Sequence, residues 1–210
     1  MKKRPQSKPQ IEELADFAAL LNALRRVKRV IRANGEKRWE NDVEHSYQLA
    51  MLAWYAIMAL KLPLNLEKVL RYALAHDLVE VYAGDTYLFS TDEKHKNGKQ
   101  GREEKARRRL IKQFPELSPL HEAILAYQEK TDAESQFVYA LDKLQPLLNI
   151  YLDDGRTWQE MEVTLSMIDE AKREKVKLSP IVKKYYDQLI DLIKERKEEL
   201  FPKAKYGKKV

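Results

Sequence analysis

The stretch that decides the fold is residues 66–85, LEKVLRYALAHDLVEVYAGD. Apolar residues recur in its first half at helical spacing, so we expect a helix that continues through His76 and Asp77. Almost every other long segment of the 210-residue chain has the same period, and its runs of β-branched residues are short. The sequence therefore predicts an all-α fold, organised as a single-domain helical bundle.

Four side chains within residues 76–85 can bind a metal ion or move a proton: His76, Asp77, Glu80 and Asp85. His76 and Glu80 are four residues apart and would share one face of the helix, whereas Asp77 is rotated from His76 by about 100°. Gly84 can end the helix in a left-handed conformation, which would fold Asp85 back toward the same place. An imidazole beside a carboxylate is costly to bury without a partner, and a divalent metal ion would be such a partner.

Length and composition limit the class of protein. A chain of this length can bury a substantial core within one domain. It has no cysteine, which excludes disulfides and thiolate metal sites. Its basic N-terminus is not followed by an apolar signal segment, and it has no apolar run of about 18 residues. We therefore expect a cytoplasmic protein with no membrane span.

The net positive charge is concentrated at the two ends of the chain. Residues 1–10 and residues 203–210 each carry four basic side chains and no acid. Subtracting these eight charges from the net charge of +6 leaves −2 for residues 11–202. We therefore predict a slightly acidic folded body over residues 11–202, between two basic tails. Such tails can contact nucleic acid, but solubilising ends are the commoner use, so nucleic-acid binding is not favoured.

Two helices are expected before the central stretch. Apolar spacing predicts the first over residues 11–33, and the pair Asn34-Gly35 would end it. The second is predicted over residues 43–60, with Asp42 as its N-cap. His45 then lies in the first turn of this helix, near solvent and able to point into a cleft.

Two features are expected after the central stretch. Residues 86–101 are polar and contain His95 among lysines, which predicts a mobile flap beside the site. A helix is predicted over residues 135–152, and Asp142 lies among its core positions. A carboxylate at such a position needs a polar or metal partner.

The polar groups at helical positions form a mixed nitrogen and oxygen donor set: His45, His76, Asp77 and Asp142. Such a set suits Mn²⁺, Fe²⁺, Co²⁺, Zn²⁺ or Ni²⁺, admits Mg²⁺ and is less typical of Ca²⁺. Four protein ligands leave coordination positions open for water and substrate, and bound water becomes a source of hydroxide near neutral pH. Glu80, one turn from His76, would be placed to move protons to or from that water.

Three segments resemble a known family: ENDVEHS (40–46), AHDLVEVYAGD (75–85) and ALDKLQPLLN (140–149). Their order, a histidine, a His-Asp doublet and a distant aspartate, is similar to that of the HD-domain metal-dependent phosphohydrolases. The context of these motifs looks like the 5′-deoxynucleotidase branch, which removes phosphate from deoxynucleoside monophosphates. The resemblance spans residues 25 to about 180 and implies a helical bundle of the HD-domain type.

The resemblance also implies roles for individual residues. The implied metal ligands are His45, His76, Asp77 and Asp142. Glu80 matches the glutamate that activates water or protonates the leaving group, and Asp85 matches an aspartate that assists catalysis or holds the sugar. Family members use an arginine upstream of the first histidine to bind phosphate, and Arg32 and Arg38 are the candidates for it here.

These observations together predict a metal-dependent phosphohydrolase that removes the 5′-phosphate of (deoxy)nucleoside monophosphates by attack of a metal-bound water. One alternative is an HD-domain hydrolase of another phosphoester, such as a nucleoside triphosphate, a cyclic nucleotide or an alarmone. A second is a non-catalytic helical module that binds nucleic acid. A covalent intermediate is not expected, because the chain has no cysteine and no serine in a recognisable nucleophile motif. Members of this branch are often dimers, so the resemblance also implies a homodimer.

Overall fold

The computed structural model describes residues 9–89, 92, 94 and 97–201. The predictions about the two tails lie almost wholly outside these residues, as does His95. The predicted flap over residues 86–101 falls partly outside them and stays a prediction.

The described part of the chain is mainly helical, as the sequence predicts, with one small antiparallel sheet. Its helices are α1 (Gln10–Leu24), α2 (Asp42–Leu60), α3 (Leu66–Ala75), α4 (Glu80–Ala83), α6 (Lys99–Gln113), α7 (Ser118–Glu129), α8 (Ala133–Leu152), α9 (Arg156–Glu160), α10 (Leu165–Val176), α11 (Pro180–Glu195) and α12 (Lys197–Leu200). The predicted helical bundle is confirmed. None of the described helices combines the length and the apolar composition that a membrane span requires.

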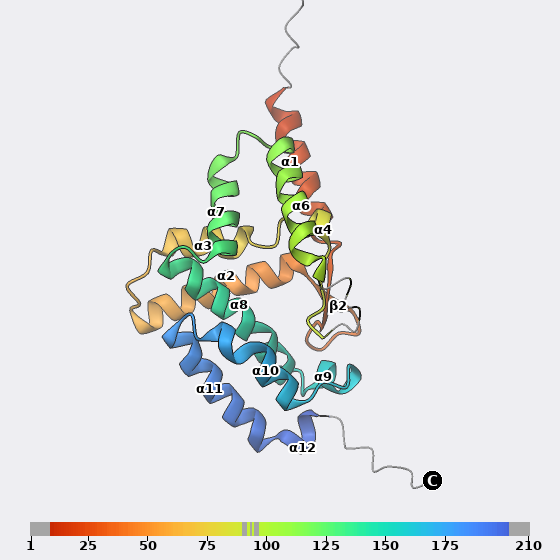
Figure 1. Ribbon diagram of the computed structural model, residues 1–210, viewed down its shortest axis with the longest axis vertical. Helices are drawn as coiled ribbons and strands as arrows, with labels where there is room; N and C mark the ends of the chain where they lie inside the picture. Colours follow the sequence, from red (N-terminus) through yellow and green to blue (C-terminus); the bar gives the residue numbers. More distant parts are fainter. Residues whose placement is uncertain (1–8, 90–91, 93, 95–96, 202–210) are drawn as a thin grey trace, which may run out of the picture.

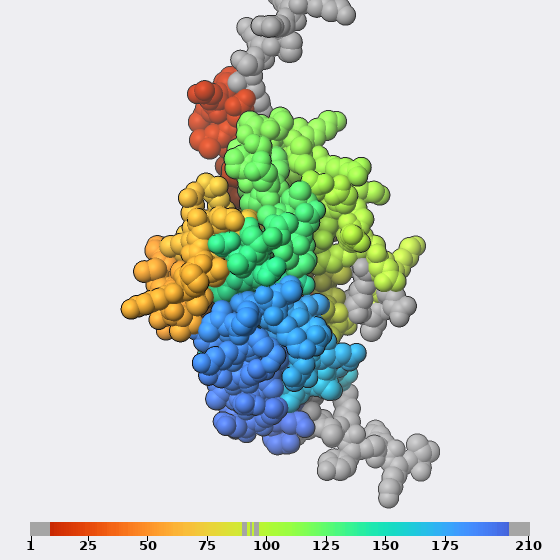
Figure 2. Space-filling view, turned by 60° about the vertical axis from the view of Figure 1, so that its left-hand side comes forward, coloured from red at the N-terminus to blue at the C-terminus, as the bar shows by residue number. Residues whose placement is uncertain are grey.

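Helix α8 is the centre of the bundle. It packs against α2, α3 and α7 on one part of its surface and against α10 and α11 on another, with α1 and α6 toward one end of the molecule (Figure 1). Figure 2 shows the surface of α10 and α11, in blue, directly beneath that of α7 and α8, in green. The buried side chains of α8 include Phe137, Val138, Leu141 and Leu144. Any polar group on the inner surface of α8 is therefore held far from bulk water.

The predicted first helix is wrong beyond Leu24. Residues Lys28–Arg32 form strand β1, which pairs antiparallel with β2 (Trp39–Asn41) across a turn that contains Gly35 at φ +73°. Val30 and Ile31 are both β-branched, and β-branched side chains favour a strand over a helix. A long-range contact also supports the strand, because the N–H of Arg32 donates to the Thr157 hydroxyl at 3.0 Å.

The predicted helix through the central stretch is interrupted. Helix α3 ends at Ala75, and His76 is its C-cap residue, with its N–H bonded to the carbonyl of Tyr72 at 3.0 Å. A tight turn follows, in which the N–H of Glu80 donates to the carbonyl of Asp77 at 2.9 Å. Such i to i+3 bonds wind the chain more tightly than an α-helix. Glu80 therefore belongs to the separate short helix α4 and does not share an α-helical face with His76.

The start of α2 also differs from the prediction. Its N-cap is Asn41, whose side chain accepts the N–H groups of Val43 and Glu44 at 3.1 and 3.2 Å. The Glu44 carboxylate in turn accepts the N–H of Asn41 at 3.1 Å, which completes a capping box. Asp42 is thus the first helical residue and its carboxylate is free to face inward. His45 is fully buried against α8, where the sequence had suggested a position near solvent.

Candidate active site

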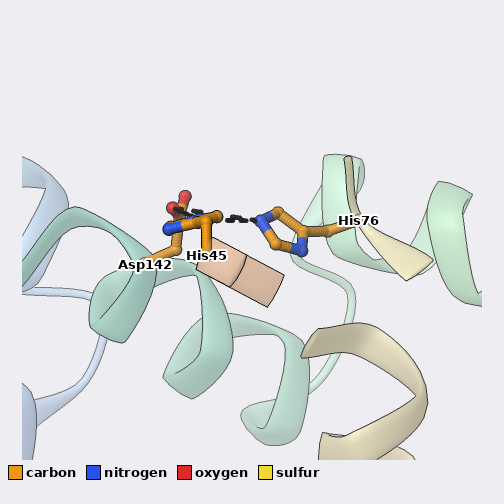
Figure 3. A group of neighbouring side chains, drawn as sticks. All are labelled: His45, His76 and Asp142. Atoms are coloured by element: carbon orange, nitrogen blue, oxygen red, sulfur yellow. Dashed lines mark hydrogen bonds and ion pairs between the residues drawn. The ribbon is translucent and has the colours of Figure 1, made fainter. Parts of the chain in front are cut away.

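Three polar side chains meet where α2, α3 and α8 converge (Figure 3). They are His45 from the first turn of α2, His76 from the end of α3 and Asp142 from the middle of α8. The Nε2 atom of His45 lies 3.0 Å from Oδ1 of Asp142 and 3.3 Å from Nε2 of His76. Their exposed fractions are 0% for His45 and 3% for each of the other two. Helices distant in sequence thus bring three potential metal ligands to one buried point.

Asp77 completes this group from the turn after α3. Its Oδ2 atom lies 3.1 Å from Nε2 of His76 and 3.7 Å from Nε2 of His45. The structure therefore brings together all four residues that the sequence predicts as metal ligands. We refer to His45, His76, Asp77 and Asp142 as the metal cluster.

Hydrogen bonds outside the metal cluster orient its atoms. The Nδ1–H of His76 donates to the carbonyl of Ala73 at 2.9 Å, which leaves Nε2 to present a lone pair. The hydroxyl of Tyr127 donates to Oδ2 of Asp142 at 2.6 Å, and the ammonium of Lys143 donates to the same oxygen. Oδ1 of Asp142 is therefore the oxygen directed at the histidines. Hydrogen bonds from neighbouring groups to the ligand side chains are typical of metal sites in proteins.

A group of acids surrounds Arg29 beside the metal cluster. Its guanidinium Nη1 lies 2.8 Å from Oδ2 of Asp77 and 3.2 Å from Oδ1 of Asp42, and its Nε lies 3.6 Å from Oε1 of Glu40. Glu80 belongs to the same group, since its carboxylate lies within 4.8 Å of those of Asp42 and Asp77. One arginine thus faces several buried carboxylates. A divalent cation in the metal cluster would offset this excess of negative charge.

The pKa values follow from this crowding. Burial and the nearby carboxylate of Asp77 raise the pKa of Asp42 to about 7, and the same two causes raise the pKa of Glu80 well above its usual value. Burial also raises the pKa of Asp85. For Asp77, burial acts in the same direction, but His76 and Arg29 outweigh it and hold its pKa below the usual value. A lowered pKa favours the carboxylate form of Asp77, which is the form that could bind a cation.

The buried donors fit a divalent cation on their chemistry. Two imidazoles and two carboxylates match the ligands that Mn²⁺, Fe²⁺, Co²⁺, Zn²⁺ and Ni²⁺ take in proteins. Within the described part of the chain, Nδ1 of His45 and Oε1 of Glu40 have no hydrogen-bond partner, although they lie 3.7 Å apart. A cation on Nε2 of His45 would make the Nδ1–H a stronger donor toward Glu40.

Glu80 and Asp85, the predicted catalytic residues, line one cavity together with His76, Asp77 and Asp142 of the metal cluster. This cavity has a volume of about 830 Å³, and its wall includes Arg29, Asp77 and Asp142. Glu80 is buried, and its Oε2 has no hydrogen-bond partner among the described residues.

The two arginines predicted to bind phosphate are not brought to this cavity. Nε of Arg32 pairs with Glu160 at 2.7 Å, and Arg38 pairs with Glu36 at 2.8 Å and Glu44 at 2.7 Å. The arginine that reaches the metal cluster is Arg29 instead. In a strand, successive side chains point to opposite faces, so residues 29 and 32 face different ways. The predicted helix would instead have placed residues 29 and 32 on the same face.

Two further site residues were missed at the sequence level. Tyr127 lies on α7, and its hydroxyl is bonded to Asp142. Lys143 follows Asp142 in α8, and its ammonium donates to the same carboxylate. Neither residue carries a local signal, because each partnership depends on how distant helices pack.

Comparison with known proteins identifies the family. The profile of the HD domain matches residues 21–183, which is most of the chain, so the protein belongs to the HD-domain family. It is 31% identical over 139 residues to the 5′-deoxynucleotidase HDDC2 of Bos taurus, and 32% identical over 140 residues to that of Homo sapiens. Each match covers 64% of this chain and 65% of the relative. The resemblance to the 5′-deoxynucleotidase branch is therefore confirmed.

A solved structure resembles the whole fold. It is the crystal structure of a predicted metal-dependent phosphohydrolase from Magnetospirillum magnetotacticum. The TM-score is 0.78 at 28% sequence identity, and the alignment covers 96% of this chain and 100% of that one. The helical arrangement that builds the metal cluster is thus shared with a protein of that description.

Proposed function

We propose that this protein is a metal-dependent phosphohydrolase that removes the 5′-phosphate of deoxynucleoside and ribonucleoside monophosphates. The observation that carries the proposal is the convergence of His45, His76, Asp77 and Asp142 at one buried point, from which the last three line a cavity. The names of the relatives support the same chemistry, although the matches span about two thirds of their length.

The metal cluster would hold one divalent cation through Nε2 of His45, Nε2 of His76 and the carboxylates of Asp77 and Asp142. When bound, such a cation supplies charge stabilisation for the phosphate and lowers the pKa of a coordinated water. Tyr127 and Lys143 hold the Asp142 carboxylate in the orientation that this binding requires. His76 is held in the matching tautomer by its bond to Ala73.

Arg29 takes the phosphate-binding role that the family resemblance assigns to an arginine upstream of the first histidine. Its guanidinium lies against Asp77 and lines the cavity, so a phosphate beside the metal cluster would lie within its reach. A guanidinium can donate two parallel hydrogen bonds to phosphate oxygens. Arg29 would therefore orient the phosphate and neutralise part of its charge.

Glu80 would hold or move the proton of the attacking water or of the leaving oxygen. It is buried in the cavity wall, next to Asp77, and its Oε2 is unpaired among the described residues. Asp85 lines the same cavity and would assist that transfer or hold the sugar. Both assignments agree with the roles that the resemblance implies.

The test is phosphate release from a panel of deoxy- and ribonucleoside 5′-monophosphates with added Mn²⁺ or Co²⁺. The Glu80→Gln variant should lose about 10²- to 10⁴-fold in kcat, the usual contribution of a general acid or base, while it still binds metal. The matched control is Glu67→Gln, which changes an exposed carboxylate on α3. Absence of release from every nucleotide by the wild-type protein would refute the proposal.

We also propose that the protein forms a homodimer through the outer face of α2. Its exposed side chains are large and apolar: Tyr47, Met51, Trp54, Tyr55 and Met58. The opposite face of α2 buries Leu49, Ala53 and Ile57 in the core. A contiguous apolar outer face of this kind supports a protein interface. Light scattering should give twice the chain mass, and Trp54→Glu should give the monomer mass.

A further inference from the structure

A set of cationic side chains lines the same cavity as His76, Asp77 and Asp142 of the metal cluster. We call it the lysine group: Lys99 from α6, Lys143 from α8, and Lys172 and Lys175 from α10. Lys172 is only 8% exposed, and Lys175 is half-buried. Long lysine side chains normally keep their ammonium groups in bulk water, so a buried lysine at a cavity wall is unusual.

Only half of the lysine group is paired with carboxylates among the described residues. Lys143 pairs with Asp142, and Lys99 pairs with Glu103 at 3.4 Å. Among the described residues, no carboxylate forms an ion pair or hydrogen bond with Lys172 or Lys175. Burial, with the nearby charge of Lys143, lowers the pKa of Lys172 to about 7, and burial also lowers the pKa of Lys175. Two adjacent ammonium groups that lack counter-ions in a partly desolvated wall would be stabilised by an anion.

In the proposed function, the metal cluster and Arg29 bind one phosphate. The lysine group would therefore bind a different anionic group. The base and sugar of a common nucleotide carry no negative charge that would need two ammonium groups. A cavity of about 830 Å³ is within the range of sites that hold a whole small-molecule ligand. It can therefore receive a nucleotide with more than one phosphate.

We propose that Lys172 and Lys175 form a subsite for a second phosphate, so that nucleotides with a further phosphate group are preferred to the monophosphates of the proposed function. The inference rests on the proposed function, because the metal cluster and Arg29 would bind the phosphate that is removed. The second phosphate would stand on the sugar or on the first phosphate, and the lysine group would select for it. A free phosphate ion has the same chemistry and is the competing occupant.

The test compares ligand binding with and without the second phosphate. Calorimetry on the Glu80→Gln protein, loaded with Mn²⁺, gives the Kd of dAMP, dADP and deoxyadenosine 3′,5′-bisphosphate. We expect at least one ligand with two phosphates to bind about tenfold more tightly than dAMP, since a charge-assisted hydrogen bond contributes on this scale. Adding Lys172→Met should abolish this preference.

The matched control is Lys177→Met, added to the same protein. Lys177 is exposed at the end of α10 and pairs with Glu174, so the preference for two phosphates should remain. Lys175→Met provides a second test at a half-buried position, where folding is less at risk, and should also reduce the preference. Equal binding of all three ligands, or a preference unchanged by both Lys172→Met and Lys175→Met, would overturn the proposal.

A third arm separates the two sources of phosphate. If inorganic phosphate binds together with dAMP, depends on Lys172, and the ligands with two phosphates show no advantage, the subsite takes free phosphate and the substrate assignment is overturned. The binding preference does not depend on turnover. A wild-type protein that hydrolyses no nucleotide but keeps a Lys172-dependent preference would refute the proposed function and leave the subsite standing.

Discussion

Two groups of charges adjoin the metal cluster, and they differ in how their charges are matched. At Asp77, one arginine is surrounded by carboxylates, which we call the acidic group: Glu40, Asp42, Glu80 and Asp85 around Arg29. The second is the lysine group, which includes the Asp142 partner Lys143 and in which two of four ammonium groups have no carboxylate partner among the described residues. The first group has an excess of negative charge and the second has an excess of positive charge.

The difference indicates what the cavity is built to hold. An excess of buried carboxylate is relieved by a cation, and an excess of buried ammonium is relieved by an anion. A metal ion together with a phosphate ester supplies both charges side by side. Asp77 comes from the turn after α3 and Asp142 comes from α8, and the carboxylates of both lie near Nε2 of His45. The following changes test this division, in order of expected effect.

Asp77→Asn should have the largest effect, because Asp77 belongs to the metal cluster and also holds Arg29. We expect metal affinity to fall by more than about 100-fold and activity to fall below detection. Loss of a residue that only supports a metal ligand lowers affinity by about 100-fold at most. Metal titration and phosphate release measure the two effects. The control is Asp187→Asn, which changes a half-exposed carboxylate on α11. Unchanged metal affinity in Asp77→Asn would remove Asp77 from the cluster.

Tyr127→Phe should have the next largest effect. It removes the hydroxyl that holds Oδ2 of Asp142, while the ring keeps its packing at 4.9 Å from the ring of His76. Loss of such a supporting bond typically lowers metal affinity or activity by about 10- to 100-fold. Tyr139→Phe is the matched control, because Tyr139 contacts the ring of Tyr127 and forms no bond to Asp142. An equal effect of both variants would mean that Tyr127 acts only through packing.

Arg29→Lys should lower kcat/KM by about tenfold, since lysine keeps the charge but loses the two-point fork that fits a phosphate. Arg32→Lys should change kcat/KM less than twofold, because Arg32 pairs with Glu160 away from the cavity. Steady-state kinetics on the best substrate of the panel decides between the two arginines. The reverse ranking would return the phosphate-binding role to Arg32 and contradict the geometry of β1.

Asp132→Ala should have the smallest effect and should act on stability alone. Asp132 caps α8 by accepting the N–H of Ser135 at 2.7 Å, so its loss costs about 1 kcal/mol. Burial raises its pKa, but Lys68 and the N–H of Ser135 outweigh this and lower the pKa from 3.8 to about 2. A lowered pKa stabilises the fold above 3.8, and this stabilisation is lost as the pH falls toward 2. The Tm difference between wild type and variant should therefore shrink over that interval, and a constant difference would contradict the pairing.

The helical fold and the order of the metal-cluster residues could be predicted from the sequence because both leave local signals. Apolar spacing defines α3 and α8, and the positions of His45, the His-Asp doublet and Asp142 follow a family order. The break between α3 and α4 could not be predicted, because every residue from 76 to 83 is compatible with a helix. Only packing decides that the turn tightens and buries Leu78 and Val79.

Strand β1 and the two groups of charges could not be predicted from the local sequence, for a different reason. Val30 and Ile31 fit the apolar spacing of a helix as well as that of a strand, and pairing with residues 39–41 decides between them. Lys172 is a polar residue on an amphipathic helix, where a solvent-exposed position is the normal expectation. Its burial comes from the packing of α10 on α8, which the sequence does not display.

The metal content of the protein tests the metal cluster most directly. Purified protein is stripped with chelator, dialysed against Mn²⁺, Co²⁺, Fe²⁺, Zn²⁺ or Ni²⁺ in separate samples, and analysed by elemental mass spectrometry beside the Asp142→Asn variant. We predict one tightly bound ion per chain for at least one of these metals in the wild type, and none above background in the variant. Absence of bound metal in the wild-type protein under every loading condition would contradict the account.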